Sequence, residues 1–231
     1  MKRFYKQAAA APVDGGFGVT LDGKPVRTPA GAILTAATPA LAEALAAEWA
    51  EQTGEVRPLA MPLNRLALTQ QDRVGPRRDA VTTEALAYVE SDLLCYRSGD
   101  DATLAARQIA AWNPLLDWFA ASYGVTLAIT DGLMPVAQDT AALEPLRAKL
   151  DGFSDAELTA LALLAPAAGS FVLALALLDG RLSAEEAYAL SQLDESYQIE
   201  KWGEDEEAAE RRAALALEFQ DIGRFLALNR G

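Results

Sequence analysis

Histidine is absent from the 231-residue chain, and cysteine occurs once, as Cys95. Without histidine, the chain cannot form Ser-His-Asp or Cys-His nucleophilic sites, histidine-ligated metal sites or a histidine-based pH switch. A single cysteine forms neither an internal disulfide nor a thiolate metal cage. Because no histidine base could activate it, we expect Cys95 to be a buried structural thiol.

Basic residues are in the minority. Lysine and arginine total 20 and aspartate and glutamate total 33, which gives a formal charge of −13. Nucleic-acid backbones and anionic membrane surfaces require a cationic face, so neither is expected as a main partner. A basic protein surface or an exposed apolar surface suits such a chain better. The hydrophobic share of 51% and the charged share of 23% are typical of globular proteins and exclude general disorder.

Only one uncharged stretch is long enough to suggest a membrane span, the 21 residues Leu158–Leu178. Its centre reads Pro166-Ala167-Ala168-Gly169-Ser170, where proline and glycine break a helix. The stretch therefore predicts two short helices in a core, without stable membrane insertion. The basic start Met1–Lys6 is not followed by an apolar segment typical of secretory signals, so we expect a cytosolic location.

The first third of the chain predicts a small antiparallel sheet covered by a helix. Phe17, Val19 and Leu21 alternate as in a half-buried strand, between turn signals at 14–16 and 22–23. Further short strands are expected at Val26 and at 33–34. Thr38-Pro39 is typical of a helix start, Leu41, Leu45 and Trp49 recur every fourth residue, and Gly54 ends the helix. The segment 56–69 is expected to be a last strand or a connector.

The remainder predicts helices. Several local signals indicate them. They are the apolar stripe Val81, Ala85, Val89 and Leu93, the stripe Trp112, Leu115, Leu116 and Phe119, a helix over 139–150, the capping boxes at 154–157 and 183–186, a break at Gly180 and a last helix from about 204 to 228. The fold class is thus α+β, with an N-terminal sheet-plus-helix domain (1–75) and a C-terminal helical bundle domain (76–231).

Signatures of phosphate chemistry are missing. The glycine-rich run Gly15-Gly16-Phe17-Gly18 lacks a Walker lysine and a following helix, which favours a hairpin turn. Acidic pairs occur at Glu90 and Asp92, at Asp194 and Glu195, and along 204–207. Paired carboxylates leave a hydrolase open as an alternative, although a solvated acidic helix face explains them more simply.

The segment 190–203 is the most unusual one. Ala187, Leu190, Asp194, Tyr197 and Lys201 succeed one another at spacings of three and four, which places an acid in a row that otherwise faces a core. Asp194 either pairs locally, with Lys201 or with an arginine of another helix, or marks the rim of a recognition groove. For the neighbouring Trp202, the spacing favours a core position.

Sequence pieces spread over nearly the whole chain resemble a known family. They are Arg3-Phe4-Tyr5-Lys6, Leu21-Asp22-Gly23-Lys24-Pro25-Val26, Thr28-Pro29, Glu48-Trp49, Met61-Pro62-Leu63-Asn64-Arg65-Leu66-Ala67, Asp92-Leu93-Leu94-Cys95-Tyr96-Arg97, Arg107-Gln108, Trp112, Pro114-Leu115-Leu116-Asp117-Trp118, Met134-Pro135 and Tyr197-Gln198-Ile199-Glu200-Lys201-Trp202-Gly203. In order and spacing they are similar to the ATP-twelve family, assembly chaperones for the α subunit of the soluble catalytic sector of F-type ATP synthase.

The resemblance implies an N-terminal α/β domain, a C-terminal helical domain, no catalytic activity, no cofactor and no small-molecule substrate. The implied partner is the unassembled ATP synthase α subunit, whose assembly interface the chaperone shields until the β subunit replaces it. The chain resembles a bacterial, cytoplasmic member, whereas mitochondrial members would lie in the matrix. A general adaptor that docks a partner helix is a further alternative. The expected partner-binding residues are Asp194, Glu195, Tyr197, Gln198, Lys201, Trp202, Glu204, Glu206 and Glu207.

Overall fold

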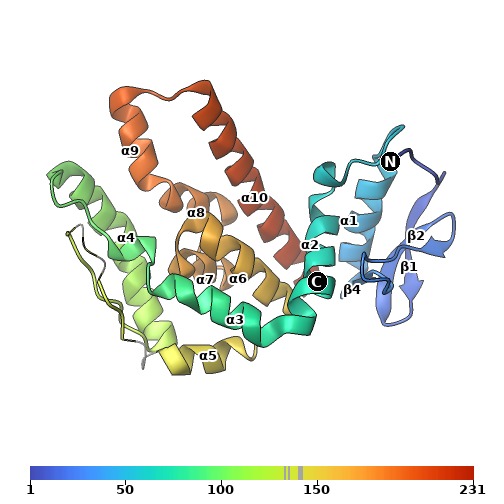
Figure 1. Cartoon of the computed structure of the whole chain (residues 1–231), viewed down its shortest axis with the longest axis horizontal. Helices are drawn as coiled ribbons and strands as arrows, with labels where there is room; N and C mark the ends of the chain where they lie inside the picture. Colours follow the sequence, from blue (N-terminus) through green and yellow to red (C-terminus); the bar gives the residue numbers. More distant parts are fainter. Residues whose placement is uncertain (133, 135, 140–142) are drawn as a thin grey trace. The chain divides into compact units, whose positions relative to one another are not determined.

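The computed structural model describes residues 1–132, 134, 136–139 and 143–231, and it groups them into two compact units (Figure 1). The first unit comprises Met1–Arg78, Ser154–Thr159 and Asp221–Gly231. The second comprises Asp79–Phe153 and Ala160–Gln220. The first unit holds the sheet and the second is helical, which confirms the predicted α+β class.

The sheet of the first unit is built on a hairpin of β1 (Ala8–Val13) and β2 (Gly16–Leu21). Asp14 and Gly15 form its turn, and Gly15 and the following Gly16 have φ of +91° and +140°, a backbone conformation that suits glycine. The short strands β3 (Lys24–Pro25) and β4 (Thr35–Ala36) both pair with β2 in antiparallel register. The glycine-rich run is therefore a turn, as predicted. The alanine-rich β1 was not predicted, because alanine has little preference for strands.

Helix α1 (Pro39–Ala50) lies against β1 and β2 (Figure 1). Thr38 caps it as predicted, since its hydroxyl accepts the backbone N–H of Leu41 at 3.0 Å. The next segment differs from the expectation of a strand or connector. It forms a 3₁₀ turn (Pro58–Ala60) and helix α2 (Pro62–Thr69), because a buried carboxylate from α1 accepts the first N–H groups of α2.

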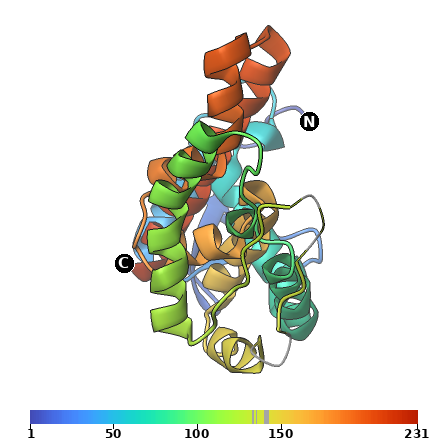
Figure 2. The same ribbon diagram turned by 90° about the vertical axis from the view of Figure 1, so that its left-hand side faces the viewer.

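The remaining helices follow in chain order. They are α3 (Arg78–Leu86), α4 (Ala102–Tyr123), α5 (Glu144–Leu150), α6 (Asp155–Ala168), α7 (Phe171–Leu178), α8 (Ala184–Ser191), α9 (Leu193–Trp202) and α10 (Glu206–Arg230). The predicted stripe 81–93 is interrupted after Leu86 by 3₁₀ turns at 87–89 and 93–95. Of the helix predicted over 139–150, Glu144–Leu150 is observed, and 140–142 lie outside the described residues. Figure 2 shows α9 and the first turns of α10 as two neighbouring helices of the second unit.

The long uncharged stretch forms two core helices, as predicted. Pro166 does not break the first of them, since α6 continues to Ala168 and ends at Gly169, whose φ is +62°. The hydroxyl of Ser170 then accepts the N–H of Leu173 and caps α7, whose eight residues are all buried. In the part of the chain that the structure describes, no helix is long and apolar enough to cross a membrane. Both predicted capping boxes are present, at 154–157 and at 183–186.

Candidate functional site at helix α9

One side of α9 is fixed to α4 by polar contacts. The amide of Gln108 donates to the carboxylate of Asp194 at 2.8 Å. The hydroxyl of Tyr197 and the ammonium of Lys201 both donate to Oδ2 of Asp101, at 2.8 and 2.7 Å. Three of the predicted partner-binding residues, Asp194, Tyr197 and Lys201, therefore hold the two helices together. We call these three residues the inner α9 row.

Electrostatics strengthens this attachment. Asp101 is the N-cap of α4, and its side chain also accepts the N–H groups of Thr103 and Leu104. The hydrogen bonds from Lys201 and Tyr197 hold the pKa of Asp101 well below its usual value, and Asp101 in turn raises the pKa of Lys201. Both groups therefore stay ionised across the physiological pH range.

A second ion pair lies beside the inner α9 row. Nη1 of Arg107 donates to both carboxylate oxygens of Glu200, at 2.9 and 2.8 Å. The guanidinium of Arg107 also lies 4.9 Å from the ring centre of Tyr197, in cation–π contact. For Asp194, burial raises the pKa of the carboxyl, although the hydrogen bond from Gln108 favours the ionised form. Asp194 is paired locally, but its hydrogen-bond partner is Gln108 of α4 and neither Lys201, which binds Asp101, nor an arginine, as was predicted.

The other side of α9 faces solvent. Glu195, Gln198 and Trp202 are exposed, and their spacing of three and four residues places them on one helix face; we call them the outer α9 row. The prediction of a core position for Trp202 is wrong, because 77% of its surface is exposed. Trp202 lies five positions after the buried Tyr197, which turns its side chain by about 140° around the helix relative to that of Tyr197.

The start of α10 adds further acids. Glu204 pairs with Arg212 at 3.1 Å, and Glu207 pairs with Arg211 at 2.6 Å. Glu206 is exposed. A cavity of about 270 Å³ lies between α9 and α10, lined by Gln192, Glu195, Ala208, Arg211, Arg212 and Leu215. The predicted acidic region around α9 and the start of α10 is thus a surface with a small cavity. Arg211 and Arg212 of α10 neutralise part of its negative charge.

Asp92 and Cys95 form a second cluster, which is buried. The carboxylate of Asp92 accepts the N–H groups of Leu94 and Val172 at 2.9 Å each, and the hydroxyl of Ser170 at 2.8 Å. Burial raises the pKa of Asp92 to about 6 and, with the charge of Asp92, raises that of the Cys95 thiol to about 12. Cys95 is buried, as predicted. Of the predicted Glu90–Asp92 pair, Asp92 accepts hydrogen bonds from backbone N–H groups.

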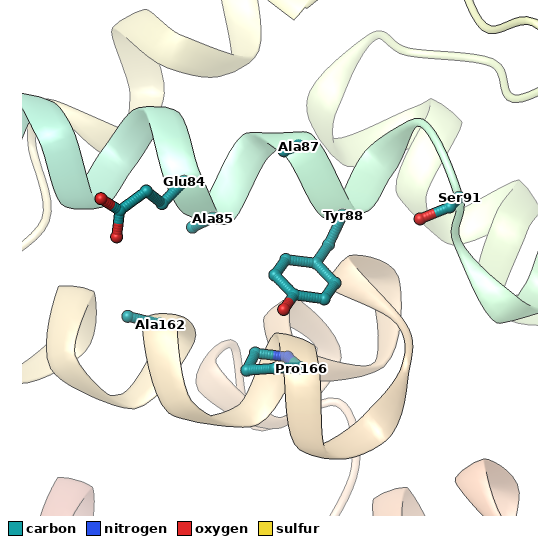
Figure 3. A pocket seen from close by; sticks show the side chains of 7 residues that line it. All are labelled: Glu84, Ala85, Ala87, Tyr88, Ser91, Ala162 and Pro166. Atoms are coloured by element: carbon teal, nitrogen blue, oxygen red, sulfur yellow. The ribbon is translucent and has the colours of Figure 1, made fainter.

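A larger cavity, of about 530 Å³, lies between α6 and the segment 84–91 (Figure 3). Its lining contains one carboxylate, that of Glu84, together with the phenol of Tyr88 and the hydroxyl of Ser91. The hydrolase alternative needs two converging carboxylates, and none of the predicted acidic pairs contributes to this lining. Among the described residues, no group of three or more His, Cys, Asp or Glu side chains could hold a metal ion.

The first unit has its own buried polar network, which the sequence analysis missed. The carboxylate of Glu48 accepts the N–H groups of Leu63 and Asn64 at 2.8 and 2.9 Å, and the indole of Trp49 donates to Oδ1 of Asn64 at 2.8 Å. The hydroxyl of Tyr5 donates to the carbonyl of Trp49 at 2.7 Å. An acid next to tryptophan inside an apolar helix stripe was the available signal.

Comparisons with known proteins agree with this architecture. The profile of the family described as ATP12 chaperone protein matches residues 2–120. The curated Schizosaccharomyces pombe protein named "Protein atp12, mitochondrial" is 26% identical over 221 residues, which cover 90% of this chain and 76% of that relative.

Two crystal structures are similar along nearly the whole chain. That of Atp12 from Paracoccus denitrificans has a TM-score of 0.92 and 39% identity, and covers 99% of this chain and 98% of its own. That of a protein from Agrobacterium tumefaciens has a TM-score of 0.91 and 42% identity, and covers 98% of this chain and 85% of its own.

Proposed function

Because the chain belongs to the ATP12 chaperone family, we propose that it binds the unassembled α subunit of F-type ATP synthase and promotes assembly of the catalytic head. It acts as a binding protein without catalysis, in the bacterial cytoplasm or, for mitochondrial relatives, in the matrix. The exposed Trp202 carries the proposal for the binding surface, since an indole 77% exposed beside carboxylates is typical of a contact residue.

The inner and outer α9 rows have different roles in this proposal. The inner α9 row is occupied by contacts with α4, so it positions the helix. The outer α9 row is free to touch a client, and Glu195 also lines the cavity between α9 and α10. An exposed acidic surface attracts a basic partner and fixes its register. We therefore expect the α subunit to offer arginine or lysine side chains here.

The binding test compares charge reversals on one helix pair. The variants are Glu195→Lys and the double change Glu206→Lys with Glu207→Lys, and the control is Glu218→Lys, an exposed acid farther along α10. We expect the test variants to capture less α subunit from solution, while the control captures the native amount. Native capture should also weaken with added salt, because exposed charges are screened within about 10 Å at 0.1 M ionic strength. Equal capture by all variants, independent of salt, would contradict the assignment of the acidic surface.

A second assay tests chaperoning itself. We expect the native chain to suppress aggregation of isolated α subunit near a one-to-one ratio and without added nucleotide, because the sequence lacks a phosphate-binding motif. Light scattering of heated α subunit measures this. Suppression that requires ATP hydrolysis by this chain would overturn the proposal. A chain that protects many unrelated proteins equally well would instead support the general adaptor.

A further inference from the structure

The cavity between α6 and the segment 84–91 has a pair of residues on each of two walls. Glu84 and Tyr88 lie four positions apart on one wall, and Ala162 and Pro166 lie four positions apart on the other (Figure 3). A spacing of four residues places side chains on one face of a helix, about one turn apart. The cavity, of about 530 Å³, is thus a groove between two helical faces, and we call it the Pro166 cavity.

Pro166 leaves a backbone acceptor without its helical donor. Helix α6 runs from Asp155 to Ala168, so Pro166 lies inside it. In an α-helix the N–H of each residue donates to the carbonyl four positions earlier, and proline has no N–H. The carbonyl of Ala162 therefore lacks the donor that its own helix would supply. Because Ala162 and Pro166 both line the Pro166 cavity, this carbonyl can accept a hydrogen bond from a group that enters it.

The other polar groups of the lining also accept hydrogen bonds. An ionised carboxylate, as on Glu84, only accepts, and the hydroxyls of Tyr88 and Ser91 accept as well as donate. Lysine and arginine are absent from the described residues that line this cavity. The surrounding sequence is acidic too, since residues 79–231 contain ten basic and 26 acidic side chains. The Pro166 cavity therefore suits a cation that carries N–H donors.

The ring of Tyr88 adds a surface for an aliphatic chain. Figure 3 shows this side chain pointing from its own segment toward α6. The residue is half-buried and lines the cavity, so part of its surface remains open there. Pro166 contributes apolar atoms from the other wall. Arginine and lysine combine a cationic head, which binds aromatic rings, with an aliphatic stem, which packs on apolar atoms.

We propose that the Pro166 cavity binds an arginine or lysine side chain of a partner polypeptide. The guanidinium or ammonium group donates to the carbonyl of Ala162 and to the carboxylate of Glu84, and the stem packs between Tyr88 and Pro166. An acidic side chain is rejected, because the lining offers it a carboxylate and no cation. This site shares no residue with the surface proposed at α9, so either assignment can fail without the other.

The first test determines the class of ligand with the full chain, isotope-labelled for NMR. The probe is a short peptide with one arginine between two leucines, and its control carries citrulline, a neutral analogue of similar shape, in place of arginine. We expect the arginine peptide to cause saturable shifts of backbone amides within 84–91 and 160–168. The citrulline peptide should bind at least about tenfold more weakly. Equal binding of the two peptides, no saturable shift, or shifts confined to α9 and α10 would overturn the proposal.

A third probe, ethylguanidinium, tests whether the occupant is part of a polypeptide. It carries the cationic head alone, so we expect it to bind more weakly than the arginine peptide, whose neighbouring residues add apolar contacts. Equal affinity of ethylguanidinium and the peptide would assign the cavity to a small organic cation and overturn the proposal.

Replacing a proline isolates the carbonyl of Ala162. Pro166→Ala supplies the missing N–H, which pairs this carbonyl within α6, so the affinity for the arginine peptide should fall at least about fivefold. Pro114→Ala is the matched control, because Pro114 lies inside α4, is exposed and does not line the cavity. Both variants gain a helical hydrogen bond, so neither should lower Tm. Native affinity in Pro166→Ala, or an equal loss in Pro114→Ala, would contradict the assignment.

A second pair of variants tests the charge of the occupant. Glu84→Gln keeps the shape of the side chain and removes its charge, so the affinity for the arginine peptide should fall at least about fivefold. Glu90→Gln changes an exposed acid that does not line the cavity, and it should keep the native affinity. Equal affinities of these two variants would overturn the choice of a cationic occupant.

Discussion

In the first unit the carboxylate of Glu48 accepts the N–H groups of Leu63 and Asn64, and in the second the carboxylate of Asp92 accepts those of Leu94 and Val172. Each acid is buried and satisfies backbone donors that would otherwise lack partners. Their charge is less alike, since residues 1–78 contain ten basic and seven acidic side chains, whereas residues 79–231 contain ten basic and 26 acidic ones. A buried carboxylate thus fixes the local fold of both units, while the excess of acid lies outside the first 78 residues.

The largest effect should follow from removing a buried acid. Asp92→Ala leaves two N–H groups and the hydroxyl of Ser170 without an acceptor, so we expect a loss of about 3–5 kcal/mol and a drop of about 10 °C in Tm. Glu48→Ala should cause a loss of similar size. Circular dichroism on heating measures both. Glu90→Ala, an exposed neighbour, is the control and should change stability by less than about 0.5 kcal/mol. An unchanged Tm for Asp92→Ala would break the parallel between the units.

The two tryptophans Trp49 and Trp202 compare a residue that packs inside the first unit with one that is exposed on the second. Trp49→Arg removes the hydrogen bond to Asn64 and the ring contact with Tyr5, and should cost about 3 kcal/mol and much of the folded protein. Trp202→Arg changes an exposed residue and should cost less than about 0.5 kcal/mol. Thermal unfolding of both variants tests this. A stable Trp49→Arg variant would show that the ring serves contact with a partner.

The pH dependence of stability isolates Asp92. Its pKa rises from 3.8 to about 6 on folding, so the native state holds the proton more tightly than the unfolded chain. The stabilising contribution is therefore complete below about pH 4 and is lost as the pH rises through about 6, a change of about 3 kcal/mol. Urea unfolding of the native chain and of Asp92→Asn across this range measures the difference. A constant difference between the two proteins would contradict the assignment.

The smallest losses of stability are expected from replacing arginines, and they should differ between the partly buried Arg3 and the exposed Arg107. Arg3→Met removes bonds to three carbonyls in a partly buried place and should cost about 2 kcal/mol. Arg107→Met removes an exposed ion pair with Glu200 and a cation–π contact with Tyr197, and should cost about 1 kcal/mol. Added salt should reduce only the second loss. Equal losses for the two variants would remove this distinction between the units.

Local sequence signals determined much of this fold. The hairpin turn at Asp14–Gly15, the Thr38 cap and the capping box at Ser183–Glu186 all formed as predicted, because each depends on residues a few positions apart. The long uncharged stretch predicted two core helices for the same reason, although Gly169, and not Pro166, ends the first one. The family, too, followed from the order and spacing of short motifs.

Tertiary structure alone decided what covers each face of an element. The helical spacing predicted a core position for both Trp49 and Trp202, but Trp49 is half-buried and Trp202 is exposed. Tyr5 and Asn64 lie beside Trp49, whereas no other element covers Trp202 within the described residues. Helix α2 required the carboxylate of Glu48, and Asp194 required Gln108, a partner 86 positions away. The alanine-rich β1 exists because β2 pairs with it along six residues. Contacts between distant segments leave no periodic trace in the sequence, so they became visible only in the folded chain.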